Sequence, residues 1–211
     1  MNMFERYPIL VIDTETGGLS PREHSLLSIA GVAWTPETQP RPLFSFYVRE
    51  PQLFTTPRAL EVNRVDLKKV EREGLTPKEA VEAIRYALDH HYGPGREPVM
   101  LCGHNISFDL GFVERLYRLA GFNQREDFSR KTLDTVAVFQ FFMAAGLIPP
   151  GKADGDRMFS SLGIPIPEEH RHTALGDAWA TSLSLSRMAQ SVRRGNIPAS
   201  VGAGQLHPHH K

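Results

Sequence analysis

The sequence predicts a single α/β domain with a mixed β-sheet, and two features of its organisation indicate this fold class. Three apolar stretches separated by short proline-containing turns lie in the first 48 residues, an arrangement typical of antiparallel strands. Helix and strand patterns then alternate, as they do where helices connect the strands of a sheet. The chain has 211 residues, which suits one well-cored domain better than two.

Strands are expected at four places, each an apolar run bounded by turn residues. The first three are Ile9 to Ile12, Leu26 to Trp34 and Leu43 to Val48, and the fourth is Pro98 to Cys102. The first and fourth runs lead directly into polar segments. Because ligands of α/β sheets bind at the carboxyl ends of strands, a functional site is expected where these two strands end.

The clearest helix signal is a capping box formed by Thr76 and Glu79, with Pro77 at the first helical position. Apolar residues then recur with the helical period until Gly93. Further helices are expected within 53–65, ahead of Gly121, and over 133–143, 158–162 and 174–188.

Composition and charge exclude several classes of protein. The formal net charge is zero, which argues against a strong non-specific binder of duplex nucleic acid. The single cysteine, Cys102, cannot form an intramolecular disulfide, which suits a reducing compartment. The N-terminus lacks the apolar core of a signal peptide, and no apolar run approaches transmembrane length. We therefore expect a cytoplasmic protein that does not bind membranes.

Four carboxylates in three segments indicate a metal site. Asp13 and Glu15 follow the first strand and, being two residues apart, share a face of it. Asp109 enters a helix after the fourth strand, and Asp177 lies among small apolar residues, where an unpaired carboxylate is costly. Neighbouring carboxylates repel one another unless a cation lies between them, and hard oxygen ligands favour Mg²⁺ or Mn²⁺.

A histidine precedes the last of these acids. Five helical steps from His172 to Asp177 come to about 500°, so the two side chains cannot share a face of one helix. His172 is therefore expected on the loop before the helix, with Asp177 fixed in its first turns. This division suits a general base beside a metal site.

Together these segments resemble the three motifs of the DnaQ-like exonuclease superfamily, in the DEDDh branch marked by the histidine. The motifs are Asp13-Thr14-Glu15-Thr16-Gly17-Gly18-Leu19, His104-Asn105-Ile106-Ser107-Phe108-Asp109 and His172-Thr173-Ala174-Leu175-Gly176-Asp177-Ala178. The resemblance implies a ribonuclease H-like three-layer fold, with a mixed sheet of roughly five strands flanked by helices. The expected exonuclease domain is 1–190, and 191–211, which is rich in Gly, Pro and His, is expected to be a flexible C-terminal tail.

The resemblance also implies 3′→5′ hydrolysis of a nucleic acid to 5′-mononucleotides, with two Mg²⁺ or Mn²⁺ ions as cofactors. Asp13, Glu15 and Asp177 would hold the first ion, and Asp13 with Asp109 the second. His172 would deprotonate the attacking water. Positions that match substrate contacts of the family are Thr14, Thr16, Gly17, Leu19, Asn63, His104, Asn105 and Phe108.

Two subgroups of the superfamily compete. One resembles the proofreading epsilon subunit of DNA polymerase III, which would imply single-stranded DNA 3′ ends as substrate, a DNA polymerase or replication partner, and proofreading or repair. The other resembles ribonuclease T, whose loop is similar to Pro57-Arg58-Ala59-Leu60-Glu61-Val62-Asn63. Ribonuclease T stacks aromatic residues on terminal bases, and here Leu19 and Val62 replace two of them while Phe108 is kept.

The replaced aromatics favour DNA over RNA. Trimming of RNA 3′ ends in the manner of ribonuclease T or oligoribonuclease is the alternative. A catalytically inactive nucleic-acid-binding module is a further alternative, which the presence of all four acids and His172 disfavours. Several relatives dimerise, so a homodimer is a further expectation from the resemblance.

Overall fold

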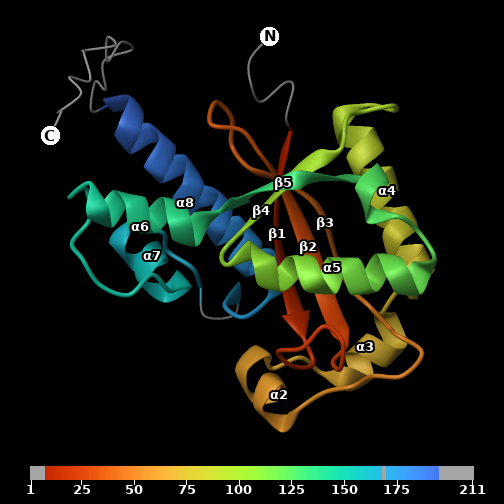
Figure 1. The fold of residues 1–211 in the computed structure, drawn as a ribbon. Helices are drawn as coiled ribbons and strands as arrows, with labels where there is room; N and C mark the ends of the chain where they lie inside the picture. The colour runs from red at the N-terminus through yellow and green to blue at the C-terminus, as the bar shows by residue number, and fades with distance from the viewer. Residues whose placement is uncertain (1–7, 168–169, 195–211) are drawn as a thin grey trace, which may run out of the picture.

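The computed structural model describes residues 8–167 and 170–194, in which a central sheet carries helices on both faces (Figure 1). The strands are β1 (Ile9–Thr16), β2 (Leu26–Trp34), β3 (Arg41–Tyr47), β4 (Val99–Gly103) and β5 (Phe128–Asp134), in the order β3-β2-β1-β4-β5. The first three strands pair antiparallel, whereas β4 and β5 run parallel to β1. The predicted mixed sheet of about five strands is confirmed.

Successive side chains of β1 point into two different cores. Leu10 and Ile12 pack with α4 (Pro77–Tyr92) and α5 (Ile106–Ala120) on one face of the sheet. Ile9 and Val11 pack on the other face with α6 (Thr135–Ala144), α7 (Gly155–Ser161) and α8 (Ala174–Arg194). This alternation gives the predicted three-layer arrangement, and it decides which helix each polar residue at the end of β1 will face.

Two short helices, α2 (Pro57–Asn63) and α3 (Leu67–Glu73), lie beyond the carboxyl end of β1 (Figure 1). The side chain of Asn63 donates a 2.9 Å hydrogen bond to the carbonyl oxygen of Thr16. The backbone N–H of Thr56, which caps α2, donates to the carbonyl oxygen of Gly17. These bonds attach α2 to the last residues of β1 and the loop that follows.

The predicted helix boundaries agree where a capping residue marked them. The capping box of Thr76 and Glu79 is present at the start of α4, and Gly93 follows its end. Asp134 caps α6 by accepting from the N–H of Val136. Gly121 ends α5 with a φ of 75°, a left-handed conformation that glycine adopts without strain.

The structure also differs from the sequence-based expectation. Strand β5 and helix α3 were not expected, and β1 continues through Asp13 and Glu15 to Thr16. Helix α8 continues past the expected end at 188 to Arg194, so the tail predicted to begin at 191 starts inside a helix. Residues 195–211, the rest of that predicted tail, lie outside the described residues.

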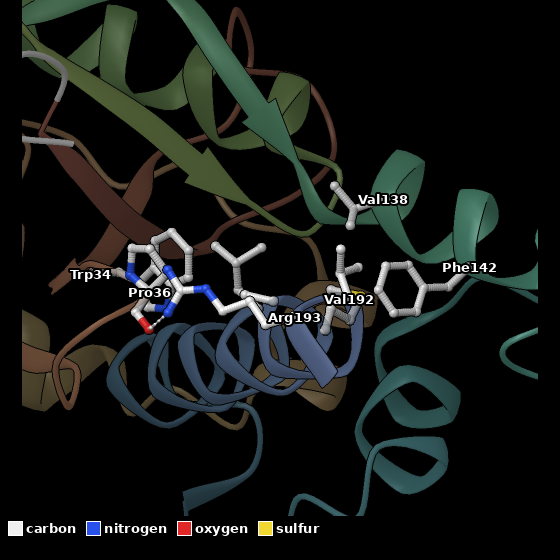
Figure 2. Close-up of a pocket in the computed structure, with 9 residues that line it drawn as sticks. Trp34, Pro36, Val138, Phe142, Val192 and Arg193 are labelled. Carbon is white, nitrogen blue, oxygen red and sulfur yellow. Dashed lines mark hydrogen bonds between the residues drawn. The ribbon is translucent and has the colours of Figure 1, made fainter. Parts of the chain in front are cut away.

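An apolar pocket of about 310 Å³ lies where the end of β2 meets α6 and α8 (Figure 2). Arg193 reaches across its rim to donate a hydrogen bond to the carbonyl oxygen of Pro36. The pocket contains none of the side chains predicted to form the site. It is lined by Trp34, Pro36, Val138, Phe142, Leu185, Met188, Ala189, Val192 and Arg193.

Across 8–167 and 170–194, the structure contains no helix with the length and apolar character needed to span a membrane.

Candidate active site

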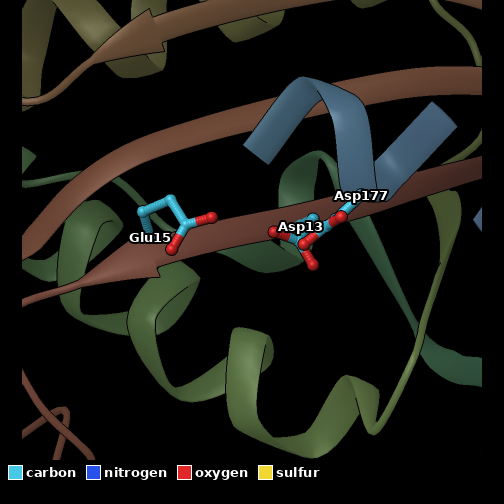
Figure 3. Close-up of side chains that lie close together, drawn as sticks. All are labelled: Asp13, Glu15 and Asp177. Atoms are coloured by element: carbon cyan, nitrogen blue, oxygen red, sulfur yellow. The ribbon is translucent and has the colours of Figure 1, made fainter. Parts of the chain in front are cut away.

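Three of the predicted acids meet at one point. Asp13 and Glu15 extend the face of β1 that packs toward α8, and Asp177 projects from the first turn of that helix (Figure 3). One carboxylate oxygen from each residue lies within 4.8 Å of the other two. Oxygen ligands this close together suit a single divalent cation.

The fourth acid approaches from the opposite layer. Asp109 lies in the first turn of α5 and is 4% exposed. Thr14, whose side chain points to the α5 face of β1, donates a 2.6 Å hydrogen bond from its hydroxyl to Asp109 Oδ1. The sequence had assigned Thr14 to substrate, whereas the structure gives its hydroxyl a partner inside the site.

Burial and mutual repulsion make the ionised state of these carboxylates unfavourable. Burial, followed by the charges of neighbouring acids, raises the pKa of Asp13 well above its ordinary value and that of Glu15 to about 8. Burial raises the pKa of Asp109 to about 7, although the Thr14 hydrogen bond acts in the opposite direction. Burial also raises the pKa of Asp177. A cation at this point would relieve all four.

Arg171 is a cation beside this cluster that the sequence analysis did not single out. Its guanidinium donates to the carboxylates of Asp177 and, on α7, Asp156. It also lies 5.3 Å from the ring centre of Phe159. Its charge lowers the pKa of the clustered carboxyls, in opposition to their burial. The only sequence signal was its place next to His172.

His172 lies on the loop immediately before α8, as expected, and is half-buried. Its φ of 56° is left-handed, an uncommon conformation outside glycine. Its charge, after that of Arg171, lowers the pKa of Asp177 in opposition to burial. A Cβ at Gly176 would lie 1.9 Å from the carbonyl oxygen of His170, so only glycine lets this loop pack against the helix. This packing fixes where His172 stands.

The segment after β1 exposes Leu19, of which 85% is accessible. Its two glycines are required by the protein's own packing. A Cβ at Gly17 would lie 2.1 Å from the carbonyl oxygen of Phe54, and one at Gly18 would lie 2.5 Å from the ring of His24. The loop is therefore compact beneath Leu19 and presents that side chain to solvent.

The remaining predicted substrate positions divide into exposed and occupied side chains. Asn105 is exposed at the start of α5 in a left-handed conformation, and its N–H donates to Asp134. His104 is half-buried and lies 3.2 Å from the hydroxyl of Thr135. The other side chains have partners inside the protein. The hydroxyl of Thr16 donates to the carbonyl oxygen of Gly18, and the side-chain amide of Asn63 donates to the carbonyl oxygen of Thr16. The ring of Phe108 packs on that of Phe112.

A buried ion pair that the sequence did not reveal supports the loop of Leu19. Arg115 of α5 donates through Nε and Nη2 to the carboxylate of Glu50, at 2.8 and 2.6 Å. Glu50 also accepts from the hydroxyl of Ser25 and the N–H of Leu26, while Arg115 donates to the carbonyl oxygen of Pro21. The pair spans 65 residues of sequence, and no local pattern marks it.

Comparison with known proteins identifies the family. A family model described as "Exonuclease" matches residues 10–183. A DNA polymerase III subunit epsilon-like protein from Rhodobacter capsulatus is 38% identical over 100 residues, which cover 46% of this chain and 13% of that protein. The 3′-5′ DNA exonuclease Cap18 from Escherichia coli is 32% identical over 109 residues, covering 51% of this chain and 56% of that protein.

Longer matches are weaker in identity. Ribonuclease T from Escherichia coli K12 is 26% identical over 203 residues, covering 92% of this chain and 90% of that protein. The solved structure of E. coli Exonuclease I in complex with a dT13 oligonucleotide matches with a TM-score of 0.69 at 16% identity, over 90% of this chain and 43% of that chain. This likeness confirms the predicted ribonuclease H-like fold. With the match over residues 10–183, the chain belongs to the DnaQ-like exonuclease family that its three motifs indicated.

Proposed function

We propose that this chain is a metal-dependent 3′→5′ exonuclease that releases 5′-mononucleotides from single-stranded or frayed DNA ends. The observation that carries the proposal is the convergence of Asp13, Glu15 and Asp177 within 4.8 Å at the end of β1. Asp109 approaches from the other layer, where it accepts a hydrogen bond from Thr14, and its charge raises the pKa of Asp13 and Glu15. Four carboxylates placed this way, Asp109 buried and the other three half-buried, have an evident use only with cations.

The donor set fits divalent metal ions. Each of the four carboxyls has a raised pKa because it is buried among like charges, and hard oxygens are the ligands that Mg²⁺ and Mn²⁺ prefer. Asp13, Glu15 and Asp177 would hold one ion, and Asp13 with Asp109 a second. Such a pair, when bound, would neutralise the charge of the phosphodiester and stabilise the leaving 3′ oxygen.

His172 is suited to remove the proton from the attacking water. It lies on the loop that enters α8, Asp177 lies in the first turn of that helix, and an imidazole nitrogen on this loop can accept a proton. The packing of the His170 carbonyl on Gly176 holds the backbone of this loop close to the start of α8. The protein's own contribution is therefore a proton acceptor at a fixed position.

The shape of the substrate follows from the loop after β1. Leu19 is exposed above a compact backbone and can press on the base of a terminal nucleotide. An end, rather than a continuous duplex, fits such a contact. The zero net charge adds little grip on a long phosphate backbone, which supports a distributive enzyme.

Two observations bear on DNA against RNA. Leu19 and Val62 stand at positions where the resemblance to ribonuclease T would imply stacking aromatics. Two relatives that share over 30% identity are named for a DNA exonuclease and a DNA polymerase subunit. RNA 3′-end trimming is the second candidate, because ribonuclease T matches almost the full length of this chain.

The test uses 5′-labelled DNA and RNA oligonucleotides of matched sequence, a paired DNA duplex and a circular single strand. With Mg²⁺, the DNA strand should shorten one nucleotide at a time, the duplex should resist, and EDTA should stop the reaction. Asp13→Asn, purified identically, controls for contaminating nucleases. Faster trimming of RNA would establish the second candidate, and cutting of the circle would reject an exonuclease.

Association with a DNA polymerase and formation of a homodimer stay predictions, as does a cytoplasmic location. The epsilon-like relative supports the first. Light scattering of the purified chain, alone and mixed with a replicative polymerase, tests both associations.

A further inference from the structure

We propose that Arg171 is the internal counter-cation of the carboxylate site: it holds Asp177 until a divalent cation takes that carboxylate, and it thereby sets how tightly the metal binds. The inference rests on the metal site proposed above. Its starting point is the pair of contacts from one guanidinium, through Nη1 to Asp177 and through Nη2 to Asp156.

The contact with Asp177 competes directly with a metal ligand. Asp177 is one of the three acids whose oxygens converge, and Arg171 donates to its Oδ1. Both side chains are largely shielded from water, at 15% and 17% exposure, so water screens the pair only partly. A guanidinium stays charged at every accessible pH. Arg171 therefore cannot leave by losing its proton, and another cation must displace it.

The second contact gives Arg171 a place to remain after that exchange. Asp156 lies on α7, and its side chain is 79% exposed, so its carboxylate is not part of the buried cluster. The ring of Phe159, also on α7, lies under the guanidinium. Release of Asp177 therefore breaks one ion pair and leaves two contacts intact.

This arrangement links metal binding to the proton acceptor. Arg171 precedes His172 on the loop that enters α8. While Arg171 bridges the two helices, the loop is tied to both Asp156 and Asp177. After exchange, the loop stays tied to α7 while Asp177 serves the metal. Arg171 is in this sense a positioning residue, not one that reacts.

The test compares two arginines that each bridge two carboxylates. Arg171→Gln removes the proposed competitor. Arg85→Gln is the matched control, because Arg85 on α4 bridges Asp127 and Glu126 on the opposite side of the sheet from α7 and α8 (Figure 1). The probe is Mn²⁺ alone, titrated calorimetrically at one pH without nucleic acid. Arg171→Gln should bind Mn²⁺ about tenfold more tightly than the wild type, and Arg85→Gln should bind it equally.

Melting temperatures supply a readout that a purely structural arginine would not reproduce. In EDTA, Arg171→Gln should melt below the wild type because the acids lose their counter-cation. In saturating Mn²⁺ that deficit should shrink, because the metal replaces the lost charge at Asp177 and only the contacts of Arg171 with Asp156 and Phe159 are still missing. Arg85→Gln should show the same deficit in both conditions, since its partners lie outside the site.

The outcomes separate this inference from the proposed function. If the wild type binds no Mn²⁺, or if Asp177→Asn binds it as well as the wild type, the metal site itself is rejected. If the wild type binds Mn²⁺ through Asp177 but Arg171→Gln has unchanged affinity, only the role of Arg171 is rejected. Arg171→Lys keeps the positive charge but lacks the planar guanidinium that contacts two carboxylates, so it should bind Mn²⁺ with an affinity between those of the wild type and Arg171→Gln. If Arg171→Gln does not fold in EDTA, the affinity of Arg171→Lys for Mn²⁺ tests the role of Arg171 instead.

Discussion

Thr14 Oγ1 donates a 2.6 Å hydrogen bond to Asp109 Oδ1, and this bond joins the two layers of the site. Thr14 lies between Asp13 and Glu15 in β1 but points to the opposite face of the sheet. One strand therefore supplies two carboxylates to one layer and a donor to the other. The position of the fourth acid depends on that donor.

Thr14→Val should raise the pKa of Asp109 in the metal-free protein. The Thr14 hydrogen bond holds down a pKa that burial has raised to about 7, so its loss should raise the pKa of Asp109 further. A hydrogen bond to a charged group contributes about 1.5–3 kcal/mol, which corresponds to about one pKa unit or more. NMR titration of the Asp109 carboxyl in EDTA measures the shift. Thr14→Ser keeps the hydroxyl and should match the wild type; an unshifted pKa in the valine variant would contradict the account.

Glu15→Gln should stabilise the protein in EDTA, and more so at high pH. The pKa of Glu15 is about 8 in the folded chain and near 4.5 in the unfolded chain, so the folded state binds the extra proton between these values. Stability therefore falls as pH rises through this window, and the penalty is complete above about pH 8. The glutamine variant carries no charge at this position. Above about pH 8 its free energy of unfolding should exceed that of the wild type by more than about 1 kcal/mol, because one pKa unit corresponds to about 1.4 kcal/mol.

Urea unfolding in EDTA near both ends of this window measures the effect of Glu15→Gln. The variant should equal the wild type at the acid end. Saturating Mn²⁺ should reverse the order, because the wild type alone keeps the full ligand set. Equal stability of the variant and the wild type at both pH values would show that the surroundings of Glu15 do not raise its pKa.

His172→Ala should separate chemistry from metal binding. Loss of a general base costs about 10²–10⁴-fold in rate, while the carboxylates stay in place. Asp177→Asn should weaken Mn²⁺ binding as well as the rate. Calorimetric Mn²⁺ titration and rates at saturating substrate distinguish the two variants. Near wild-type turnover by the alanine variant would require another proton acceptor.

Breaking the pair of Glu50 and Arg115 should weaken both stability and substrate binding. Removal of one partner of a buried ion pair costs about 3–5 kcal/mol, because the other charge stays buried alone. Glu50→Gln should therefore unfold at lower urea. Because the pair braces the loop of Leu19, the surviving enzyme should show a raised KM with little change in kcat. The double variant Glu50→Gln, Arg115→Met should recover part of the lost stability. A lowered kcat at unchanged KM would contradict the proposal that the pair acts on substrate binding through the loop of Leu19.

Much of the fold was predictable because its signals are local. The capping box at Thr76, the cap at Asp134 and the glycine at 121 mark helix ends through contacts within a few residues. Strand β1 begins with a continuous apolar run, and β2 and β4 are largely apolar throughout. Strand β5 carries no such signal, because it lies at the edge of the sheet and most of its side chains are polar and accessible. Only its pairing with β4 defines it as a strand.

The acids of the site were predictable for a different reason. Asp13, Glu15, Asp109 and Asp177 stand at the ends of strands or starts of helices, so local patterns place each at an element boundary and the fold class brings those boundaries together. Their partners were not predictable. Arg171 and Thr14 are ordinary residues in sequence, and only the packing of α7 against α8 and of α5 against β1 gives them partners.

The origin of the converging acids has a consequence for how the protein folds. Asp13 and Glu15 come from the first strand, and Asp177 comes from the last helix. The carboxylate cluster therefore joins residues near the two ends of the described chain. Such long-range closure is slow to form, because the entropy of a large loop must be lost before the contacts form. The cluster is thus absent from any intermediate in which α8 has not docked. Binding of Mn²⁺ during refolding should therefore lag behind helix formation and report the docking of the last helix onto the first strand.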